Sequence, residues 1–335
     1  MAKKILVIKS SSMGDIVHAL PVAYDIKKHF PDCELSWVVE ESFTDIPKLS
    51  PYVDKVVVTA FRRWRKHVFS SSVRAEVLGL RRALAEAHYD IVIDLQGLIR
   101  TAIVARWAGV QSVGYSRDNI KEPLAAHFYN RTLAVSNKLP PVMRYRRMAA
   151  QALGYAVSDQ DLHYGLRVLP MVPVGVRPPY AALAVNTSRA EKLWPTARWT
   201  EVARALAADG VMSVLFWGSD KERAYCDRIA SSVPGAAVVL PRLSLRSLAE
   251  VIAGSRCLIG VDTGLTHLGA ALGVPSVGII VGTSAELFSL VSENACASVG
   301  DKGVIPQPEE VLAAVHSVMT QTVQRESASG GTVTC

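Results

Sequence analysis

The sequence predicts an α/β protein made of two Rossmann-like domains, each with a parallel sheet covered by helices. Short apolar runs alternate with helix-like segments along the chain. These runs are continuously apolar, which is typical of strands buried on both faces. The chain has 335 residues, more than one hydrophobic core usually organises. A proline-rich segment at 166–179 interrupts the alternation, so we expect domains at 1–165 and 180–325 joined by this linker.

Each expected element follows from local periodicity and turn residues. The first domain should contain strands at 4–9, 34–39, 55–58 and 91–94 and helices at 16–29, 77–87 and 100–108. The second should contain strands at 180–186, 211–217, 236–240, 257–261 and 276–280 and helices at 197–209, 221–233, 245–253, 265–272 and 309–323. The last helix is a candidate for packing back on the first domain, and 326–335 reads as a polar tail. Ligands bind at the carboxyl ends of such strands, so we expect the site in a central cleft faced by both sheets.

Composition narrows the function classes. Lys plus Arg number 37 and Asp plus Glu 30, and the net charge of +7 suits an anionic partner or surface. The five cysteines are scattered and form no C-x-x-C pair, so neither a disulfide framework nor a zinc site is expected, and a reducing cytoplasm fits. No apolar run reaches the roughly 18 residues of a spanning helix, so any membrane contact should be peripheral.

The first chemical motif runs from Ser10 to Pro21, directly after the first strand. Gly14 permits a tight turn, and Asp15 lies near the start of the following helix, where negative charge is stabilised. Asp15 is therefore either a functional carboxylate or a helix cap, and its spacing alone leaves both open. No G-x-G-x-x-G is present, so dinucleotide binding has no direct support.

The second motif, at 185–195, follows the first strand of the second domain. Thr187 and Ser188 can donate hydrogen bonds and Lys192 adds a point charge, a combination that suits a diphosphate. A solvated polar loop explains the same residues equally well.

The third motif, at 260–270, again joins a strand to a helix. The residues that would direct backbone N–H groups at an anion are Thr263, Gly264, Leu265 and Thr266. Asp262 would repel a bare phosphate but suits the hydroxyls of a sugar attached to one. The motif therefore indicates a nucleotide-sugar site; capping by Asp262 with a core-facing His267 is the alternative.

Weaker candidates flank these motifs. Glu222 could bind ribose hydroxyls, and Leu243 could cover an adenine ring. Arg62, Arg63, Arg65 and Lys66 form a basic cluster that indicates an anion or membrane-surface patch, to which Arg117 could add. A solvated helix face explains the same cluster nearly as well. Arg144, Arg146 and Arg147 read as a charged helix face.

Together the three motifs resemble glycosyltransferase family nine, the lipopolysaccharide heptosyltransferases, over about residues 3–320. The form of the first motif favours the type that acts on Kdo (type I) over the type that acts on heptose (type II). The resemblance implies a GT-B fold, with acceptor bound by the first domain and ADP-heptose by the second. It implies inverting transfer of L-glycero-D-manno-heptose to the Kdo of Kdo2-lipid A, without metal, cofactor or nucleic acid. It also implies a cytoplasmic enzyme peripheral on the inner membrane.

The resemblance assigns roles residue by residue. Asp15 matches the general base, and Asp262 the residue that orients the heptose. Diphosphate contacts fall on Thr187, Ser188, Lys192 and the loop Thr263 to Thr266, and a ribose contact on Glu222. His267 keeps the family pattern. Acceptor-side residues would be Ser12, Gly14, Arg62, Arg63, Lys66 and Arg117.

Other classes remain possible on sequence alone. A nucleotide-sugar 2-epimerase of similar two-domain shape would act on the donor without an acceptor. A non-catalytic nucleotide-binding module would bind ADP without turnover. A nicotinamide dehydrogenase lacks its glycine fingerprint here.

Overall fold

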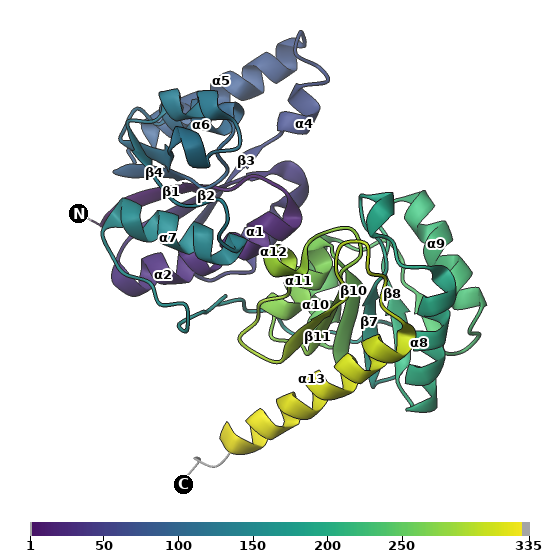
Figure 1. Cartoon of the computed structure of the whole chain (residues 1–335). Helices are drawn as coiled ribbons and strands as arrows, with labels where there is room; N and C mark the ends of the chain where they lie inside the picture. The colour runs from purple at the N-terminus through teal and green to yellow at the C-terminus, as the bar shows by residue number, and fades with distance from the viewer. Residues whose placement is uncertain (1, 330–335) are drawn as a thin grey trace. The chain divides into compact units, whose positions relative to one another are not determined.

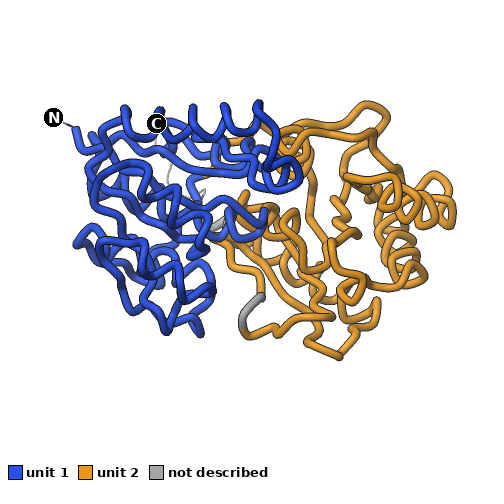
Figure 2. The backbone as a smooth tube through the Cα atoms, turned by 90° about the horizontal axis from the view of Figure 1, so that it is seen from above, with its two compact units in different colours: residues 1–165 blue, residues 166–335 orange. Residues whose placement is uncertain are grey.

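The computed structural model describes residues 2–329. Its Cα packing separates two compact units, residues 1–165 and residues 166–335, coloured blue and orange in Figure 2. Each unit contains one six-stranded sheet in which every strand pairing is parallel. The predicted fold class of two Rossmann-like α/β units is therefore confirmed.

The sheet of unit 1 has the strand order β3-β2-β1-β4-β5-β6. Its strands β1 to β4 are labelled in Figure 1. Its strands are β1 (Lys4–Ile8), β2 (Glu34–Glu40), β3 (Lys55–Thr59), β4 (Ile91–Asp94), β5 (Ser112–Tyr115) and β6 (Arg131–Leu133). The α-helices are α1 (Met13–Ala19), α2 (Pro21–His29), α3 (Asp45–Lys48), α4 (Phe61–Trp64), α5 (Ser71–Glu86), α6 (Ile99–Trp107) and α7 (Pro141–Leu153). The 3-10 turns are η1 (Glu41–Phe43), η2 (Arg117–Asn119) and η3 (Pro123–Phe128).

Unit 2 repeats this topology, with the order β12-β11-β10-β7-β8-β9. Its strands are β7 (Tyr180–Ala184), β8 (Met212–Leu215), β9 (Ala237–Val239), β10 (Cys257–Val261), β11 (Ser276–Ile279) and β12 (Cys296–Val299). Its helices are η4 (Ala190–Lys192), α8 (Thr196–Ala208), α9 (Asp220–Ser231), α10 (Leu245–Ala253), α11 (Gly264–Ala271), α12 (Ala285–Phe288) and α13 (Pro308–Ser329). In both units the order reverses beside the first strand, which makes the β1/β4 and β7/β10 junctions the expected ligand sites.

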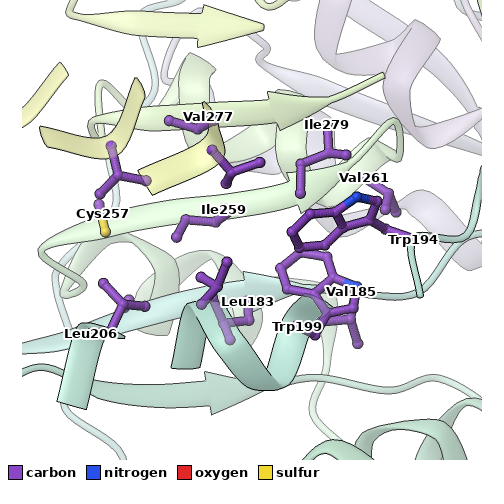
Figure 3. Packing of buried hydrophobic residues seen from close by; sticks show 14 of the residues in the cluster. Leu183, Val185, Trp194, Trp199, Leu206, Cys257, Ile259, Val261, Val277 and Ile279 are labelled. Atoms are coloured by element: carbon purple, nitrogen blue, oxygen red, sulfur yellow. The ribbon is translucent and has the colours of Figure 1, made fainter. Parts of the chain in front are cut away.

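The core of unit 2 holds the loop that carries the second motif. Trp194 and Trp199 are fully buried, and their rings meet edge to face with centroids 5.0 Å apart (Figure 3). They pack among Leu183, Ile259 and other apolar side chains of the central strands. Because Trp194 stands two positions after Lys192, this packing anchors the end of the motif loop.

Several boundaries differ from those expected. The helix expected at 16–29 is two helices that meet at Leu20, because Pro21 begins α2 and supplies no N–H to continue α1. The strands β5, β6 and β12 were not expected, since each is short and carries no run of large apolar residues. Helix α13 continues through Ser329, into the segment expected as a polar tail; residues 330–335 lie outside the described residues.

The proline-rich segment 166–179 packs on unit 2. The N–H of Met171 donates to the carbonyl of Glu250 over 2.9 Å, and the hydroxyl of Tyr180 donates to the carbonyl of Met171 over 3.0 Å. Helix α13 also packs on unit 2, where Val311, Val315 and Val318 are buried in the core around β10 and β11.

The charged face expected on α7 is wrong for one of its arginines. Arg146 is buried and forms a two-pronged ion pair with the buried Asp25 of α2, with N–O distances of 2.8 and 3.0 Å. Arg147, one position later, has a side chain that is 42% exposed and pairs with Asp159 at 3.3 Å. A helix places successive residues about 100° apart, so neighbouring arginines can meet entirely different surroundings.

No helix among residues 2–329 is long and apolar enough to cross a membrane.

Candidate active-site residues and family membership

The first motif forms an ordered loop at the β1/β4 junction of unit 1. The backbone N–H groups of Ser10 and Ser11 both donate to Oε1 of Gln96, each over 3.1 Å. Gln96 follows β4, so this side chain ties together the ends of the two strands where the order reverses. The loop that leads into α1 is thereby held at the expected ligand site.

Asp15 lies in the first turn of α1 and is held on both oxygens. Its Oδ2 accepts hydrogen bonds from the backbone N–H and the hydroxyl of Ser12, at 3.0 and 2.7 Å. Its Oδ1 accepts one from the hydroxyl of Tyr145 in α7, at 3.0 Å. The side chain is still 39% exposed, so the carboxylate is both oriented and accessible. The capping role considered from the sequence is therefore present, together with a contact that capping does not require.

Lys9 at the end of β1 sets the electrostatics of this site. Its side chain is buried, and Nζ lies 3.7 Å from Oδ1 of Asp15 and 4.5 Å from the ring centre of Tyr145. Burial raises the pKa of Asp15. The charge of Lys9 and the hydrogen bonds from Ser12 outweigh burial and lower the pKa to about 2. Burial lowers the pKa of Lys9, and the charge of Asp15 opposes that shift. Asp15 is thus a carboxylate at neutral pH.

Unit 2 places a second carboxylate, Asp262, at the end of β10. Its Oδ2 accepts from Nζ of Lys192 at 2.6 Å and from the hydroxyl of Thr283 at 2.7 Å. Nε2 of His267 lies 3.3 Å from Oδ1. Burial raises the pKa of Asp262, but hydrogen bonds from His267, Lys192 and Thr283 outweigh it and hold this pKa well below its usual range. The second and third motifs therefore meet at one buried charged cluster.

The start of α11 provides amide donors beside Asp262. Thr263 is the N-cap residue, and Gly264 and Leu265 follow in the first turn, where backbone N–H groups have no intrahelical acceptor. Thr266 differs from the expectation: its N–H donates to the carbonyl of Thr263 over 3.1 Å and its hydroxyl to that of Val261 over 2.6 Å. Thr266 therefore stabilises the loop from within, and its N–H is already engaged.

The hydroxyl residues of the second motif, Thr187 and Ser188, precede Lys192 in the same loop. Thr187 is half-buried and Ser188 exposed, and both follow β7, the neighbour of β10 in the sheet. Asn186 fixes the start of their loop because its Nδ2 donates to the carbonyl of Phe216 at the end of β8, over 2.8 Å.

Glu222 and Leu243 lie at the ends of other strands and have structural contacts of their own. Oε2 of Glu222 accepts from the N–H groups of Gly218 and Ser219 at 2.7 and 3.0 Å, which closes the capping box of α9. Leu243 is half-buried against the core cluster that includes Leu240. Residues close in sequence to Glu222 and Leu243 line a pocket of about 470 Å³. They are Trp217, Arg223, Asp227, Val239, Leu240, Pro241 and Arg242.

The basic cluster of unit 1 borders a larger pocket of about 690 Å³. Four arginines line this pocket: Arg62, Arg65, Arg74 and Arg100. Arg62 and Arg65 belong to the predicted cluster, and Arg74 and Arg100 were not predicted. Arg63 is neutralised by Glu41 at 3.1 Å and Glu76 at 2.9 Å. Its side chain is 43% exposed but its charge is already paired, and its contact with an acceptor stays a prediction.

The remaining acceptor-side residues are solvent-facing. Lys66 and Ser12 are exposed, Gly14 is half-buried in the first turn of α1, and Arg117 is exposed in η2. Neither Lys66 nor Arg117 lines the 690 Å³ pocket. Within residues 2–329, no group of three or more His, Cys, Asp and Glu side chains is placed to hold a metal ion.

Sequence reasoning missed three residues that hold the two carboxylates: Lys9, Tyr145 and Thr283. Lys9 reads as the last residue of a strand, although a lysine at the carboxyl end of a buried strand is itself a signal of a site. Tyr145 and Thr283 carry no local signal, because they reach Asp15 and Asp262 from 130 and 21 residues away in the chain.

Comparison with known proteins identifies the family. Residues 77–311 match the model of glycosyltransferase family 9 (heptosyltransferase). Lipopolysaccharide heptosyltransferase 1 of Pseudomonas aeruginosa is 40% identical over 277 residues, which cover 82% of this chain and 78% of that protein. Among solved structures, E. coli heptosyltransferase WaaC with ADP is similar at 33% identity and a TM-score of 0.86, over 94% of this chain and 99% of that one.

The same E. coli enzyme with ADP-2-deoxy-2-fluoro heptose matches at 33% identity and a TM-score of 0.80, over 96% of this chain and 99% of that one. The family match covers more than half of the chain, and the similarity extends over both units. The chain therefore belongs to glycosyltransferase family 9 and is a heptosyltransferase.

Proposed function

We propose that this enzyme transfers L-glycero-D-manno-heptose from ADP-heptose to the Kdo of Kdo2-lipid A, the first heptose of the lipopolysaccharide inner core. The observation that carries this proposal is the pair of held carboxylates, each at the strand-order reversal of its unit. Asp15 is oriented and ionised, as a base must be, and Asp262 lies beside amides that suit a diphosphate. The relatives named as heptosyltransferase 1 and the solved complex with an ADP-heptose analogue support the same donor and reaction.

In the proposed donor site, unit 2 holds the diphosphate and the sugar with different groups. Lys192 and the first amides of α11 stabilise the negative charge that grows on ADP as it leaves. Asp262 accepts hydrogen bonds from heptose hydroxyls. Nζ of Lys192 lies 2.6 Å from Oδ2 of Asp262 in this structure. Donor binding would therefore turn Lys192 toward the diphosphate and Asp262 toward the sugar.

In the proposed chemical step, one displacement inverts the anomeric centre. A Kdo hydroxyl oxygen forms a bond to the anomeric carbon as the bond from that carbon to the ADP oxygen breaks. The hydroxyl proton passes to Asp15, a contribution that general-base catalysis typically makes worth about 10²–10⁴-fold in rate. This mechanism requires Asp15 of unit 1 to reach the heptose held by unit 2. It assigns no step to a metal.

We assign the acceptor to unit 1. The basic residues near the 690 Å³ pocket, Arg62 above all, would bind the carboxylates of Kdo and the phosphates of lipid A. Lys66, Arg117, Ser12 and Gly14 remain candidate contacts. The proposed location is the cytoplasmic face of the inner membrane, because the acceptor is a lipid.

The decisive experiment is mass-spectrometric detection of heptose transfer from ADP-heptose to Kdo2-lipid A by the purified protein. Asp15→Ala should lose at least about 10²-fold in turnover with the fold intact. Turnover that survives within tenfold would show that Asp15 is not the base.

Two alternatives are separated by the choice of acceptor. A type II enzyme would transfer heptose to a core that already carries one heptose and not to Kdo2-lipid A. A 2-epimerase would convert the donor with no acceptor present. Transfer that depends strictly on Kdo2-lipid A contradicts both.

A further inference from the structure

The connection between α4 and α5, residues 65–70, presents apolar side chains to solvent. Phe69 is 94% exposed and Val68 57% exposed. Leu78, on α5, is 54% exposed. Water disfavours a group of large apolar side chains that have no cover, so such a group marks a contact with an apolar partner.

Cations surround this apolar tip. The exposed ones are Arg62, Arg65, Lys66 and Arg74. Across residues 2–329, none of the four forms an ion pair with a carboxylate.

The acidic residues close to the tip are already engaged. Glu41 and Glu76 both bind Arg63, and Glu76 also accepts from the indole N–H of Trp64 at 2.8 Å. Glu40 is buried and accepts from the backbone N–H groups of Phe61 and Arg62. The surface around Phe69 is therefore positive as well as apolar.

An exposed aromatic ring flanked by cations that have no carboxylate partner among residues 2–329 fits the boundary of an anionic lipid layer. The ring can enter the region between headgroups and acyl chains while arginine and lysine side chains remain at the phosphates. The 690 Å³ pocket has a similar character, because its lining combines four arginines with the apolar Val68, Val73, Val77 and Leu78.

We propose that residues 65–70 dock the enzyme on an anionic lipid surface, with Phe69 and Val68 inserted and with Arg65 and Arg74 bound to headgroup phosphates. The inference rests on the proposed function, which places the acceptor pocket beside this tip. It deepens that function by naming the residues that hold the enzyme where its lipid-linked acceptor resides.

The first test is flotation of the full chain with two kinds of vesicle, one of phosphatidylethanolamine with phosphatidylglycerol and one of phosphatidylcholine alone. We expect binding to the anionic vesicles only. Phe69→Ser should weaken that binding about tenfold, because the variant loses the inserted apolar area. Leu169→Ser is the matched control: Leu169 is 85% exposed in unit 2, and its replacement should change nothing.

Equal binding by Phe69→Ser and the unsubstituted enzyme would overturn the proposal, and so would an equal loss in Leu169→Ser. Arg65→Ala with Arg74→Ala should weaken binding to anionic vesicles by on the order of tenfold, with a smaller dependence on salt. Unchanged salt dependence would contradict the role of the cations.

The second test separates docking from catalysis. Turnover is measured with Kdo2-lipid A in vesicles and with a deacylated, water-soluble form of the same acceptor. Phe69→Ser should lose activity on the vesicles and keep it on the soluble acceptor. Equal losses on both would place Phe69 in the substrate site, or report a damaged fold, and would overturn the proposal. If the unsubstituted enzyme transfers heptose to neither acceptor, the proposed function fails, while the flotation result still decides the docking.

Discussion

The hydroxyl of Tyr145 donates a hydrogen bond to Oδ1 of Asp15 over 3.0 Å, joining α7 to the first turn of α1. Burial raises the pKa of the Tyr145 hydroxyl well above its ordinary value, and the adjacent carboxylate adds to that shift, so this group stays protonated and remains a donor. Asp15 is thereby aimed from outside its own helix. Because the Tyr145 hydroxyl is uncharged, its removal tests the orientation of Asp15 without removing a charged neighbour.

Tyr145→Phe should lower kcat about tenfold, because a hydrogen bond to a charged group contributes roughly 1.5–3 kcal/mol and the freed carboxylate can rotate. The KM for ADP-heptose should change by less than about twofold, since the proposed donor contacts belong to unit 2. Tyr155→Phe is the matched control, because the hydroxyl of Tyr155 has no hydrogen-bond partner in the described part of the chain. Steady-state kinetics with both variants decide the matter; equal effects would show that Tyr145 has no special role.

The pH profile of Lys9→Met reports on the charge beside Asp15. With a pKa of about 2, Asp15 is ionised throughout the range above pH 4, so its protonation should not limit kcat/KM there. Removal of the Lys9 charge raises the pKa of Asp15, because burial is then opposed only by hydrogen bonds and more distant charges. The acid limb of kcat/KM should therefore move to higher pH.

Lys3→Met provides the control for that profile, since Lys3 precedes β1 at the strand's opposite end. Circular dichroism checks that both variants fold. An acid limb at the same pH in Lys9→Met as in the unsubstituted enzyme would show that Lys9 does not tune the base.

Lys192→Met should weaken ADP binding and destabilise unit 2. The variant leaves Asp262 buried without its cation, and breaking a buried pair in this way typically costs about 3–5 kcal/mol. The uncompensated carboxylate would also repel the diphosphate, so Lys192→Met with Asp262→Asn should recover part of both losses. Calorimetry with ADP and urea unfolding measure the two effects. Full additivity of the two substitutions would mean that the 2.6 Å pair is not energetically coupled.

Arg146→Met should lower the free energy of unfolding by about 3–5 kcal/mol, because it leaves the buried Asp25 without its partner. Arg147→Ala should cost at most about 1 kcal/mol, because the pair of Arg147 with Asp159 is exposed. Urea unfolding of both variants tests this difference between adjacent arginines. Similar losses would mean that burial does not distinguish the two pairs.

The sequence predicted the fold class because continuous apolar runs such as Cys257–Val261 and Ile91–Asp94 have one good explanation, a strand covered on both faces. It was weaker where strands are short and little buried. β6 has exposed Arg131 and Thr132, and nothing in its composition separates it from a loop.

The candidate site was predictable where chemistry follows a strand directly. Asp262 and His267 lie in one motif, and the structure joins them to Lys192 of another. What could not be predicted is competition within the folded protein. Arg63 and Glu222 have the residue types of ligand contacts. In the structure, however, Glu41 and Glu76 pair with Arg63, and the N–H groups of Gly218 and Ser219, just before α9, donate to Glu222.

Gly260 in β10 leaves room for the packing of Thr266 beside the proposed donor site. A Cβ atom there would lie 2.2 Å from the hydroxyl oxygen of Thr266 and 2.8 Å from Cβ of Ala184. The hydroxyl of Thr266 fastens α11 to the end of its strand, so even one methyl group at position 260 would tilt the helix and redirect its leading amides. If the first amides of α11 hold the diphosphate as proposed, a substitution at position 260 would lower nucleotide affinity through an atom that does not contact the nucleotide.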